Sequence, residues 1–263
     1  MLTKAEGYIL RAIPYGENNK IVTILTEELG KRTAMARGAK KPASRFSAVT
    51  QLFTHGHFLI QQGKGMGTLQ QAEIIHSMRH IREDIEKAAY ASVITELIDK
   101  LTDDETASSG IYQLLHQSMQ AIEEEYDPEA ILLFVEWKML SVAGIRPHLD
   151  GCSSCGAKEG EFAFSFQQIG FLCHRCFEVD RYIIRLKPVH VRLIRTFLYT
   201  PIEGVGKIEL KKETKQFMRK IISTIYEEQV GVRLKSRQFL EQLERNPLIF
   251  QAEPIIKKDD LES

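Results

Sequence analysis

The four cysteines of this chain stand in two pairs of the same spacing, CSSC and then CHRC, with 17 residues between the pairs. A two-residue spacer lets both thiolates of a pair turn toward one ion, and two such pairs supply four ligands at about 2.3 Å in a tetrahedron. The spacing therefore predicts one bound Zn²⁺ ion. Because four protein ligands leave no open position for water, we expect a structural site. The expected ligands are Cys152, Cys155, Cys173 and Cys176.

Two other uses of these residues stay open at this point. Two disulfides would need an oxidising compartment, but the N-terminal segment has Lys4, Glu6 and Arg11 where a signal peptide needs an apolar core. His174 could replace one cysteine, although its place inside the second pair normally turns such a side chain away. Since no apolar run approaches the ~20 residues that cross a bilayer, we expect a soluble cytoplasmic protein with no membrane partner.

A second set of chemically informative residues is a long basic stretch. Between Glu28 and Glu73 the chain contains no Asp or Glu. Cationic side chains neutralise phosphates and release counterions, which makes such a stretch a candidate DNA-binding surface. The alternative is a solvated surface that only keeps the domain soluble. Lys31 belongs to the stretch, and the residues predicted to contact DNA are Arg32, Arg37, Lys40, Lys41, Arg45 and Lys64.

Aromatic residues are interleaved with these cations. Phe46, Phe53 and Phe58 could stack on unpaired bases, as aromatic side chains do in proteins that bind single strands. They could equally belong to a hydrophobic core. Phe53 and Phe58 stand in strand-like apolar runs, which favours the core for those two.

The sequence offers no recognisable catalytic motif. It contains no GxSxG and no HExxH. The GKGMG run at 63–67 lacks the spacing of a phosphate-binding loop and is interpreted as a hairpin turn. We therefore expect a protein that is not an enzyme and has no small-molecule substrate.

Charge is distributed unevenly along a chain whose formal net charge is zero. Residues 1–78 carry ten Lys and Arg against five Asp and Glu, a balance of +5. Residues 79–150 carry six against fifteen, a balance of −9, and residues 151–263 carry nineteen against fifteen, a balance of +4. This division suggests separate partners for separate parts, with solvated faces as the alternative.

The basic stretch lies in a segment with the pattern of a small barrel. Five short apolar runs occur in residues 1–76, with a longer polar link at 38–50 after the third. This arrangement suits a Greek-key barrel of the oligonucleotide-binding (OB) type, although other five-stranded barrels would give nearly the same pattern. The expected strands are 5–12, 19–26, 31–37, 52–61 and 68–75.

The pattern changes to helical spacing near residue 79. Asp127 followed by Pro128 and Glu129 is typical of a helix start, and Gly144 of its end. Around the cysteines, the runs FAFSF and IGFL predict a hairpin that brings the two pairs together. The other expected helices are 81–101, 111–124, 188–199, 214–229 and 236–243.

These patterns predict an α+β protein in three folded parts. An OB-type β-barrel occupies 1–78, and an all-helical domain is formed by 79–150 and 182–245. A zinc-ribbon-like module with the four cysteines is inserted at 151–181. A flexible tail follows at 246–263.

Together, several motifs in one order resemble a known family, RecO. They are GYILRAIPYGENNKIVTILTEELGK, ARGAKKPASR, GKGMGTLQQAE, the helical middle, CSSC with CHRC, and LKSRQFLEQL. The resemblance covers about residues 1–243 and implies an OB barrel, a helical domain and a zinc-ribbon-like module. It also places the family's basic motif on Arg37–Lys41 and Arg45, and its fourth hairpin on Lys64.

The resemblance implies a mediator of DNA repair and homologous recombination in the RecF pathway of bacteria. Such a protein binds single- and double-stranded DNA, anneals complementary strands, and with RecR loads RecA onto strands coated by single-strand-binding protein (SSB). Family members hold the acidic, Phe-ended C-terminal tail of SSB through the helical domain. The implied location is the cytoplasm, at the nucleoid. The competing classes are a zinc-ribbon transcription regulator and a nuclease.

Overall fold

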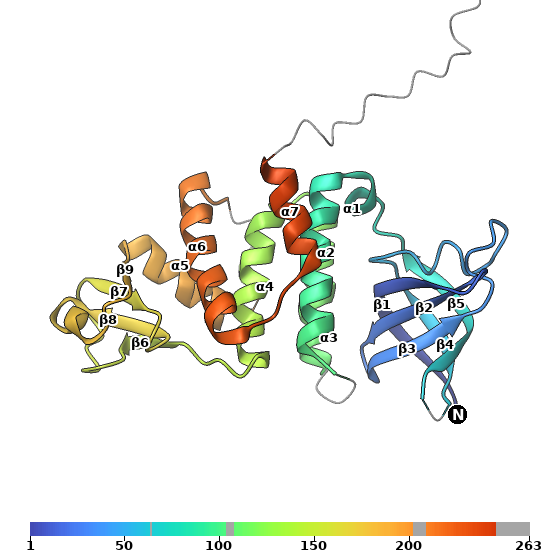
Figure 1. The fold of residues 1–263 in the computed structure, drawn as a ribbon, viewed down its shortest axis with the longest axis horizontal. Helices are drawn as coiled ribbons and strands as arrows, with labels where there is room; N and C mark the ends of the chain where they lie inside the picture. Colours follow the sequence, from blue (N-terminus) through green and yellow to red (C-terminus); the bar gives the residue numbers. More distant parts are fainter. Residues whose placement is uncertain (64, 104–107, 202–208, 246–263) are drawn as a thin grey trace, which may run out of the picture.

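The computed structural model describes residues 1–63, 65–103, 108–201 and 209–245, so the predicted tail at 246–263 lies outside the described residues. Along its longest axis the protein has a barrel at one end, helices in the middle and a small sheet at the other end (Figure 1). The helices come from chain segments on both sides of the small sheet in sequence. This arrangement confirms the predicted α+β fold.

The described N-terminal strands close into a barrel with the order β1-β2-β3-β5-β4. Neighbouring strands are antiparallel except β3 and β5, which run parallel. The parallel pair arises because the long link after β3 carries the chain across the barrel before β4 begins. This topology confirms the OB-type barrel. Its strands are β1 (Leu2–Tyr15), β2 (Asn19–Thr26), β3 (Gly30–Ala36), β4 (His55–Gln61) and β5 (Gly67–His76).

The barrel has its own hydrophobic core. Because side chains alternate between the two faces of a strand, Val22, Ile24 and Phe58 point inward and are fully buried. The link between β3 and β4 contributes to this core and is thereby fixed to the barrel. Its buried residues are Ala39, Phe46 and Val49.

The fourth strand begins at His55, three residues later than predicted. Phe53 has a φ of 69°, a left-handed conformation that ends any extended run. Its ring is buried, as predicted, but packs in the cluster shared with the helices rather than inside the barrel. The apolar pattern was therefore right about burial and wrong about the strand.

The helices of the middle part follow the expected order, and among the described residues none is long and apolar enough to cross a membrane. The helix predicted at 214–229 ends in a short π-helical segment, η3 (Tyr226–Val230). The others are α1 (Arg79–Glu83), α2 (Ile85–Leu101), α3 (Ser109–Glu123), α4 (Pro128–Val142), α5 (Pro188–Tyr199), α6 (Lys212–Ile225) and α7 (Lys235–Arg245).

The helix predicted at 81–101 is in fact interrupted at Asp84. This residue has extended backbone angles, φ −107° and ψ 116°. Its carboxylate accepts hydrogen bonds from the N–H groups of Glu86 (2.9 Å) and Lys87 (3.0 Å). Asp is among the best N-cap residues, and capping of this kind stabilises a helix by about 1 kcal/mol. The chain therefore starts a new helix, α2, instead of continuing α1.

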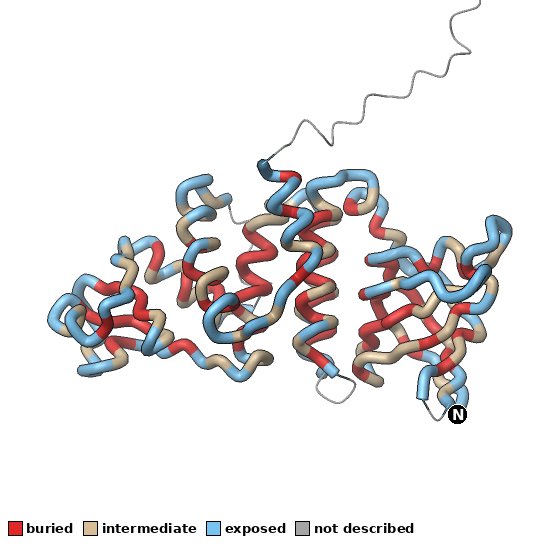
Figure 2. Tube along the Cα trace, in the orientation of Figure 1, coloured by how far each residue is buried: buried red, intermediate tan, exposed pale blue. Residues whose placement is uncertain are grey.

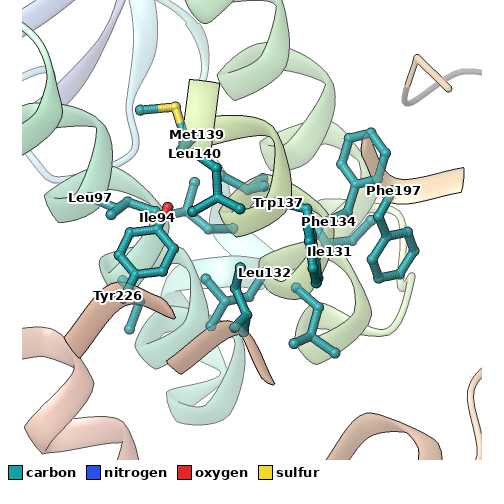
Figure 3. Close-up of a cluster of buried hydrophobic side chains, with 14 of the residues drawn as sticks. Ile94, Leu97, Ile131, Leu132, Phe134, Trp137, Met139, Leu140, Phe197 and Tyr226 are labelled. Atoms are coloured by element: carbon teal, nitrogen blue, oxygen red, sulfur yellow. The ribbon is translucent and has the colours of Figure 1, made fainter. Parts of the chain in front are cut away.

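Helix α4 lies at the centre of the helical part and packs against α2, α3, α5 and α6. Figure 3 shows its side chains surrounded by those of neighbouring helices. A helix that is apolar on nearly every side must be buried. Its one buried acid, Glu136, is paired with Arg237 of α7, and its backbone carbonyl accepts from the Tyr226 hydroxyl (3.0 Å).

The small sheet has the strand order β6-β8-β7-β9. Its central hairpin, β7 (Phe162–Ser165) with β8 (Gly170–Cys173), is the hairpin predicted between the cysteine pairs. The outer strands were not predicted because each is short and has little alternation. They are β6 (His148–Cys152) and β9 (Ile183–Arg185), and a 3₁₀ helix, η1 (His174–Val179), follows β8.

One hydrophobic cluster joins all three parts. It contains Tyr8 and Leu25 of the barrel, Trp137 of α4, and Phe164 and Phe171 of the small sheet. Figure 2 shows buried residues in the helices of the middle part as well as in the barrel and the small sheet. The three parts therefore share one continuous core in addition to the barrel's own core.

A polar and aromatic network closes the contact between barrel and helices. Tyr8 stacks on His55 with ring centroids 4.4 Å apart, and the Tyr8 hydroxyl lies 3.0 Å from Nδ1 of His116. The Tyr112 hydroxyl donates to Glu6 Oε1 (2.9 Å), which lies 2.8 Å from His55 Nε2. Burial lowers the pKa of His55, although Glu6 opposes this shift. These contacts satisfy polar atoms that the interface would otherwise leave unpaired.

Lys31 is the second fixed point of this interface. Its ammonium donates to the backbone carbonyls of Asp99 (2.7 Å) and Thr102, and lies 3.3 Å from the Asp99 carboxylate. Asp99 also pairs with Arg11 at 3.4 Å. The carbonyls belong to the C-terminal end of α2, where a cation is favoured by the helix dipole. Lys31 therefore belongs to the interface, although it lies in the basic stretch of the sequence.

This assignment predicts opposite behaviour for two lysines of the same stretch. Replacing Lys31, whose side chain is 13% exposed, by Met should lower the free energy of unfolding by about 1–3 kcal/mol because it leaves buried carbonyls unpaired. The exposed Lys41→Met variant should leave stability unchanged. Urea unfolding of both variants measures the difference. Weakened DNA binding by Lys31→Met at full stability would contradict the assignment.

Candidate metal centre and nucleic-acid interface

The first cysteine pair lies where strand β6 ends. Cys152 is the last residue of β6 and Cys155 follows in a turn. Gly156 has a φ of 75°, and its N–H donates to the Cys152 carbonyl (2.8 Å). Glycine adopts this left-handed conformation without steric cost. The turn is therefore tight enough to bring both sulfur atoms to one side.

The second pair is held against the first by the sheet. Cys173 ends β8, and Cys176 lies in the following 3₁₀ helix. The N–H of Ser153 donates to the carbonyl of Phe171 (2.7 Å), which links the first turn to β8. The N–H of His174 donates to the Glu161 carbonyl (2.9 Å), which links the second turn to the segment before β7.

The four sulfur atoms lie within 4.8 Å of one another, as the spacing predicts. Cys155 Sγ and Cys173 Sγ are 3.6 Å apart. A tetrahedron of thiolates at about 2.3 Å from an ion has edges of roughly 3.8 Å, so this geometry fits a single tetrahedral metal. Within the described residues, His174 is not part of the cluster.

At Cys152 the backbone favours thiolate, the form of cysteine that binds metals. At Cys176 a hydrogen bond with Ser154 is outweighed by hydrogen bonding to the neighbouring cysteines, which raises the pKa of Cys176 to about 12. Burial alone would raise the pKa of the Cys152 thiol. The N–H groups of Cys173, Cys155 and Ser154 point at its sulfur and outweigh burial, so the pKa falls to about 6. The site can thus bind a metal ion through four sulfur ligands, with no ligand position left for a reacting water.

The basic link lies beside the turn that connects β1 and β2. The N–H of Gly38 donates to the side-chain oxygen of Asn19 (3.0 Å), and the N–H of Lys40 donates to the carbonyl of Asn18 (3.0 Å). The Lys40 ammonium lies 3.2 Å from the carbonyl of Gly16. In OB folds, this first loop and the face of strands 2 and 3 are the usual nucleotide-binding region.

The predicted cations of the link point outward. Ala39 is buried in the barrel core, whereas Arg37, Lys40 and Lys41 on either side of it are exposed. Burial of Ala39 explains this arrangement, since the backbone cannot rotate without exposing it. The structure therefore gathers three of the predicted DNA-binding residues on one edge of the barrel.

Arg45 is exposed and lies farther along the link, over strand β5. Its guanidinium donates to the carbonyl of Gln70 (2.9 Å). It lines a shallow groove of about 340 Å³ on the outer face of the barrel, together with Lys4, His57 and Glu73. Arg45 thus extends the basic edge toward β4 and β5.

The aromatic residues of the stretch are not available to bases. Phe46, Phe53 and Phe58 are all buried. Tyr15, which was not singled out from the sequence, is 50% exposed at the end of β1. It pairs with Asn19, the residue whose side chain holds the link. One sequence feature could have identified Tyr15: it is an aromatic residue at the end of a strand, immediately before a glycine turn.

Two predicted DNA-binding residues are not placed with the others. Arg32 lies near the start of β3, where it pairs with Ile24 and donates to the carbonyl of Lys31 (2.8 Å). Arg37 lies five positions farther along the chain, which in a strand corresponds to roughly 17 Å. Lys64 lies outside the described residues.

A separate pocket of about 800 Å³ opens between α3 and α4. Most of its wall is apolar, with Ile111, Leu114 and Phe134 among the lining residues. Lys138 lies at its edge, 5.4 Å from the Phe134 ring, and donates to the carbonyl of Leu198 (2.8 Å). Burial lowers the pKa of this lysine. Among the described lining residues, the pocket combines an apolar surface with one cation, Lys138.

Comparisons with known proteins agree along almost the whole chain. Residues 1–78 match the family model described as recombination protein O N terminal, and residues 82–238 match recombination protein O C terminal. A protein of Bacillus pumilus (strain SAFR-032) named DNA repair protein RecO is 49% identical, covering 93% of this chain and 95% of its own length. Proteins of the same name from Bacillus subtilis (strain 168) and Bacillus cereus (strain AH187) are each 48% identical. They cover 93% of this chain and 96% and 99% of their own lengths.

If the four cysteines hold the metal, replacing one of them should lower stability, whereas replacing His174 should not. Cys152→Ser should abolish stoichiometric metal and lower the melting temperature, because a sulfur ligand in the sheet is lost. His174→Ala, a change between two of the cysteines, should keep both. Metal analysis by mass spectrometry and thermal unfolding measure the two quantities. Loss of metal from His174→Ala with retention in Cys152→Ser would contradict the ligand assignment.

Proposed function

This chain belongs to the RecO family, and from this premise we propose that it is a DNA repair and recombination mediator of the RecF pathway. It binds single- and double-stranded DNA and anneals complementary strands. With RecR, it loads RecA onto strands coated by SSB. The observation that carries the proposal is the set of exposed cations on the β3–β4 link, next to the first loop of an OB barrel.

These link cations are exposed and have no carboxylate partner in the part of the chain that the structure describes, although Lys40 and Arg45 each donate to one backbone carbonyl. In the described residues, no ion pair joins Arg37, Lys40, Lys41 or Arg45 to a carboxylate. Several cations of the helical part are used differently. Lys215 pairs with Asp127 (2.8 Å) and Glu129 (3.1 Å), for example. Cations without carboxylate partners at one edge support DNA binding by the barrel. We propose that this DNA-binding domain comprises residues 1–78.

Annealing needs no covalent chemistry, in keeping with a protein that is not an enzyme and has no small-molecule substrate. Two phosphate backbones must be screened while their bases stay free to pair. Arg37, Lys40 and Lys41 supply the screening, and Tyr15 offers one stacking surface without selecting a sequence. Contacts of this kind accept any strand, which suits a mediator that acts wherever DNA is damaged.

We assign Zn²⁺ to the cysteine cluster. Four thiolates in a closed tetrahedral set suit zinc, which has no redox chemistry of its own and stabilises small modules by binding. The ion would hold the turns at Cys152–Cys155 and Cys173–Cys176 together. Its role would be structural, in the module that we delimit as 151–181 between the helical segments 79–150 and 182–245. The small sheet itself extends past both limits, from β6 at His148 to β9 at Arg185.

We assign the acidic, Phe-ended tail of SSB to the pocket between α3 and α4. A phenylalanine ring fits its apolar wall, and Lys138 can pair with an acidic group of the tail. The balance of −9 in residues 79–150 repels acidic peptides elsewhere on this domain. Lys138 is therefore the cation on which binding should depend. Binding SSB and DNA in the cytoplasm would place the protein at the nucleoid.

An annealing assay tests this function against its alternatives. Labelled complementary oligonucleotides are mixed with and without the protein, with bare or SSB-coated strands, and with or without Mg²⁺. A mediator accelerates duplex formation at any sequence and leaves both strands intact. Preference for duplex of one defined sequence would instead identify a transcription regulator, and Mg²⁺-dependent cleavage a nuclease.

Removing two link cations should weaken DNA binding in a salt-dependent way. For a single strand, the log–log slope of affinity against salt is about −0.7 per neutralised charge. The double variant Lys40→Ala/Lys41→Ala should therefore flatten the slope by roughly 1.4 on every oligonucleotide sequence. Fluorescence anisotropy at several salt concentrations measures it. An unchanged slope in a folded variant would mean that DNA follows another path.

The pocket assignment predicts charge dependence at Lys138. Lys138→Glu should weaken binding of a peptide with the SSB tail sequence by at least tenfold, because it places a like charge beside an acidic ligand. Lys220→Glu, an equal charge change on α6, should leave peptide affinity unchanged. Isothermal calorimetry measures both. Equal affinities for the two variants would exclude this pocket.

A further inference from the structure

The sequence contains a second acid-free stretch, at the opposite end of the protein from the barrel. From residue 181 to residue 202 there is no Asp or Glu. Strand β9 and helix α5 lie in this stretch, next to the metal module (Figure 1). Its cations are Arg181, Arg185, Lys187, Arg192 and Arg195.

Four of these cations are exposed and have no ion-pair partner among the described residues, and the Arg185 guanidinium lies 5.5 Å from the centre of the Phe177 ring. Arg181, Arg185, Lys187 and Arg192 all face solvent, and no ion pair within the described ranges includes any of them. Arg195 is used internally, since its guanidinium donates to the carbonyls of Leu149 (2.7 Å) and Asp150 (3.3 Å). The four exposed cations are called the β9–α5 surface below.

The acid that precedes this stretch does not offset its charge at the surface. Asp180 is buried, and its carboxylate accepts from the Ser165 hydroxyl (2.6 Å) and from the N–H groups of Gln167 (3.2 Å) and Tyr182 (2.7 Å). These bonds turn the carboxylate into the sheet. They also fix the backbone from which the exposed cations extend.

An exposed aromatic residue stands within the same surface. Tyr182 is 79% exposed, while its backbone is held by Asp180 and by a hydrogen bond from Phe166 N–H (3.4 Å). A fixed backbone that presents an aromatic ring between cations is the combination used by proteins that bind unpaired strands, since bases stack on the ring while cations neutralise phosphates.

Acids beside this surface limit where a strand can lie, and exposed Glu178 precedes the stretch by three residues. Glu159 and Glu161 line a groove of about 670 Å³ between the metal module and α5, and Lys158 and Arg192 line the same groove. A phosphate backbone is repelled from its acidic side. The remaining path runs along β9 and the start of α5, past Tyr182.

We propose that the β9–α5 surface binds a second single strand of nucleic acid, a proposal that rests on the DNA-annealing function proposed above. The domain between the two basic surfaces contains the segment with a balance of −9, so one backbone does not cross it readily. Two strands can therefore be held on one molecule, one at each end. Holding the second strand raises its local concentration near the first, which accelerates pairing.

The test uses two non-complementary oligonucleotides, one with a fluorescence donor and one with an acceptor, so that energy transfer reports strands held together without pairing. The variant is Arg181→Ala/Arg185→Ala/Arg192→Ala in the full chain. The matched control, Lys211→Ala/Lys212→Ala/Lys220→Ala, removes the same charge from exposed positions of α6 and the residue before it. Anisotropy of one oligonucleotide at low protein concentration is measured in parallel.

The variant should lose energy transfer and slow annealing, while the control matches wild type. The log–log slope of second-strand affinity against salt concentration should flatten by about 2, because three phosphate contacts are removed. Energy transfer in the variant equal to that of wild type would overturn the proposal, as would a wild type that binds one strand and never two. If the wild-type protein binds no oligonucleotide in the anisotropy measurement, the proposed DNA-annealing function itself would be wrong.

Discussion

The burial of α4 on nearly every side is the constraint on which the rest of the structure depends. A helix without a polar face must be buried, and α2, α3, α5 and α6 cover it. The metal module follows α4 in sequence and precedes α5 and α6, which pack on α4. Both ends of the module are therefore fixed to the helical core. Tyr8 and Leu25 of the barrel belong to the same cluster as Trp137 of α4. The barrel and the metal module are therefore fixed to one core rather than joined by free linkers.

The position of a basic side chain relative to this core determines whether it has an internal partner or is free to contact DNA. Cations near it have internal partners: Lys31 caps the end of α2, and Arg237 neutralises the buried Glu136. The exposed cations of the two acid-free stretches, among them Lys40 and Arg181, have no carboxylate partner among the described residues. A basic side chain is informative about DNA only after its internal partners are known. Lys31 and Lys41 stand in the same stretch, yet they have opposite surroundings.

Much of this architecture was readable from the sequence because it depends on local patterns. Strand β2 matches its predicted bounds, since a run of β-branched residues ends at a turn, and the cysteine spacing placed four sulfur atoms together. What could not be read depends on contacts between distant residues. Lys31 finds its partner on α2, and Phe53 packs toward the helices, outside the barrel core. The second acid-free stretch was visible in the sequence, but its importance depends on the inward turn of Asp180.

The central claim is that one rigid core holds DNA-binding surfaces at its two ends. Hydrogen–deuterium exchange of the full chain, with and without a saturating homopolymeric oligonucleotide, tests this claim most directly. The account predicts slower exchange at residues 16–19 and 37–45 of the barrel and at 181–192 beside the metal module, with exchange in α4 unchanged. Protection confined to the helical domain, with both basic segments unaffected, would contradict it.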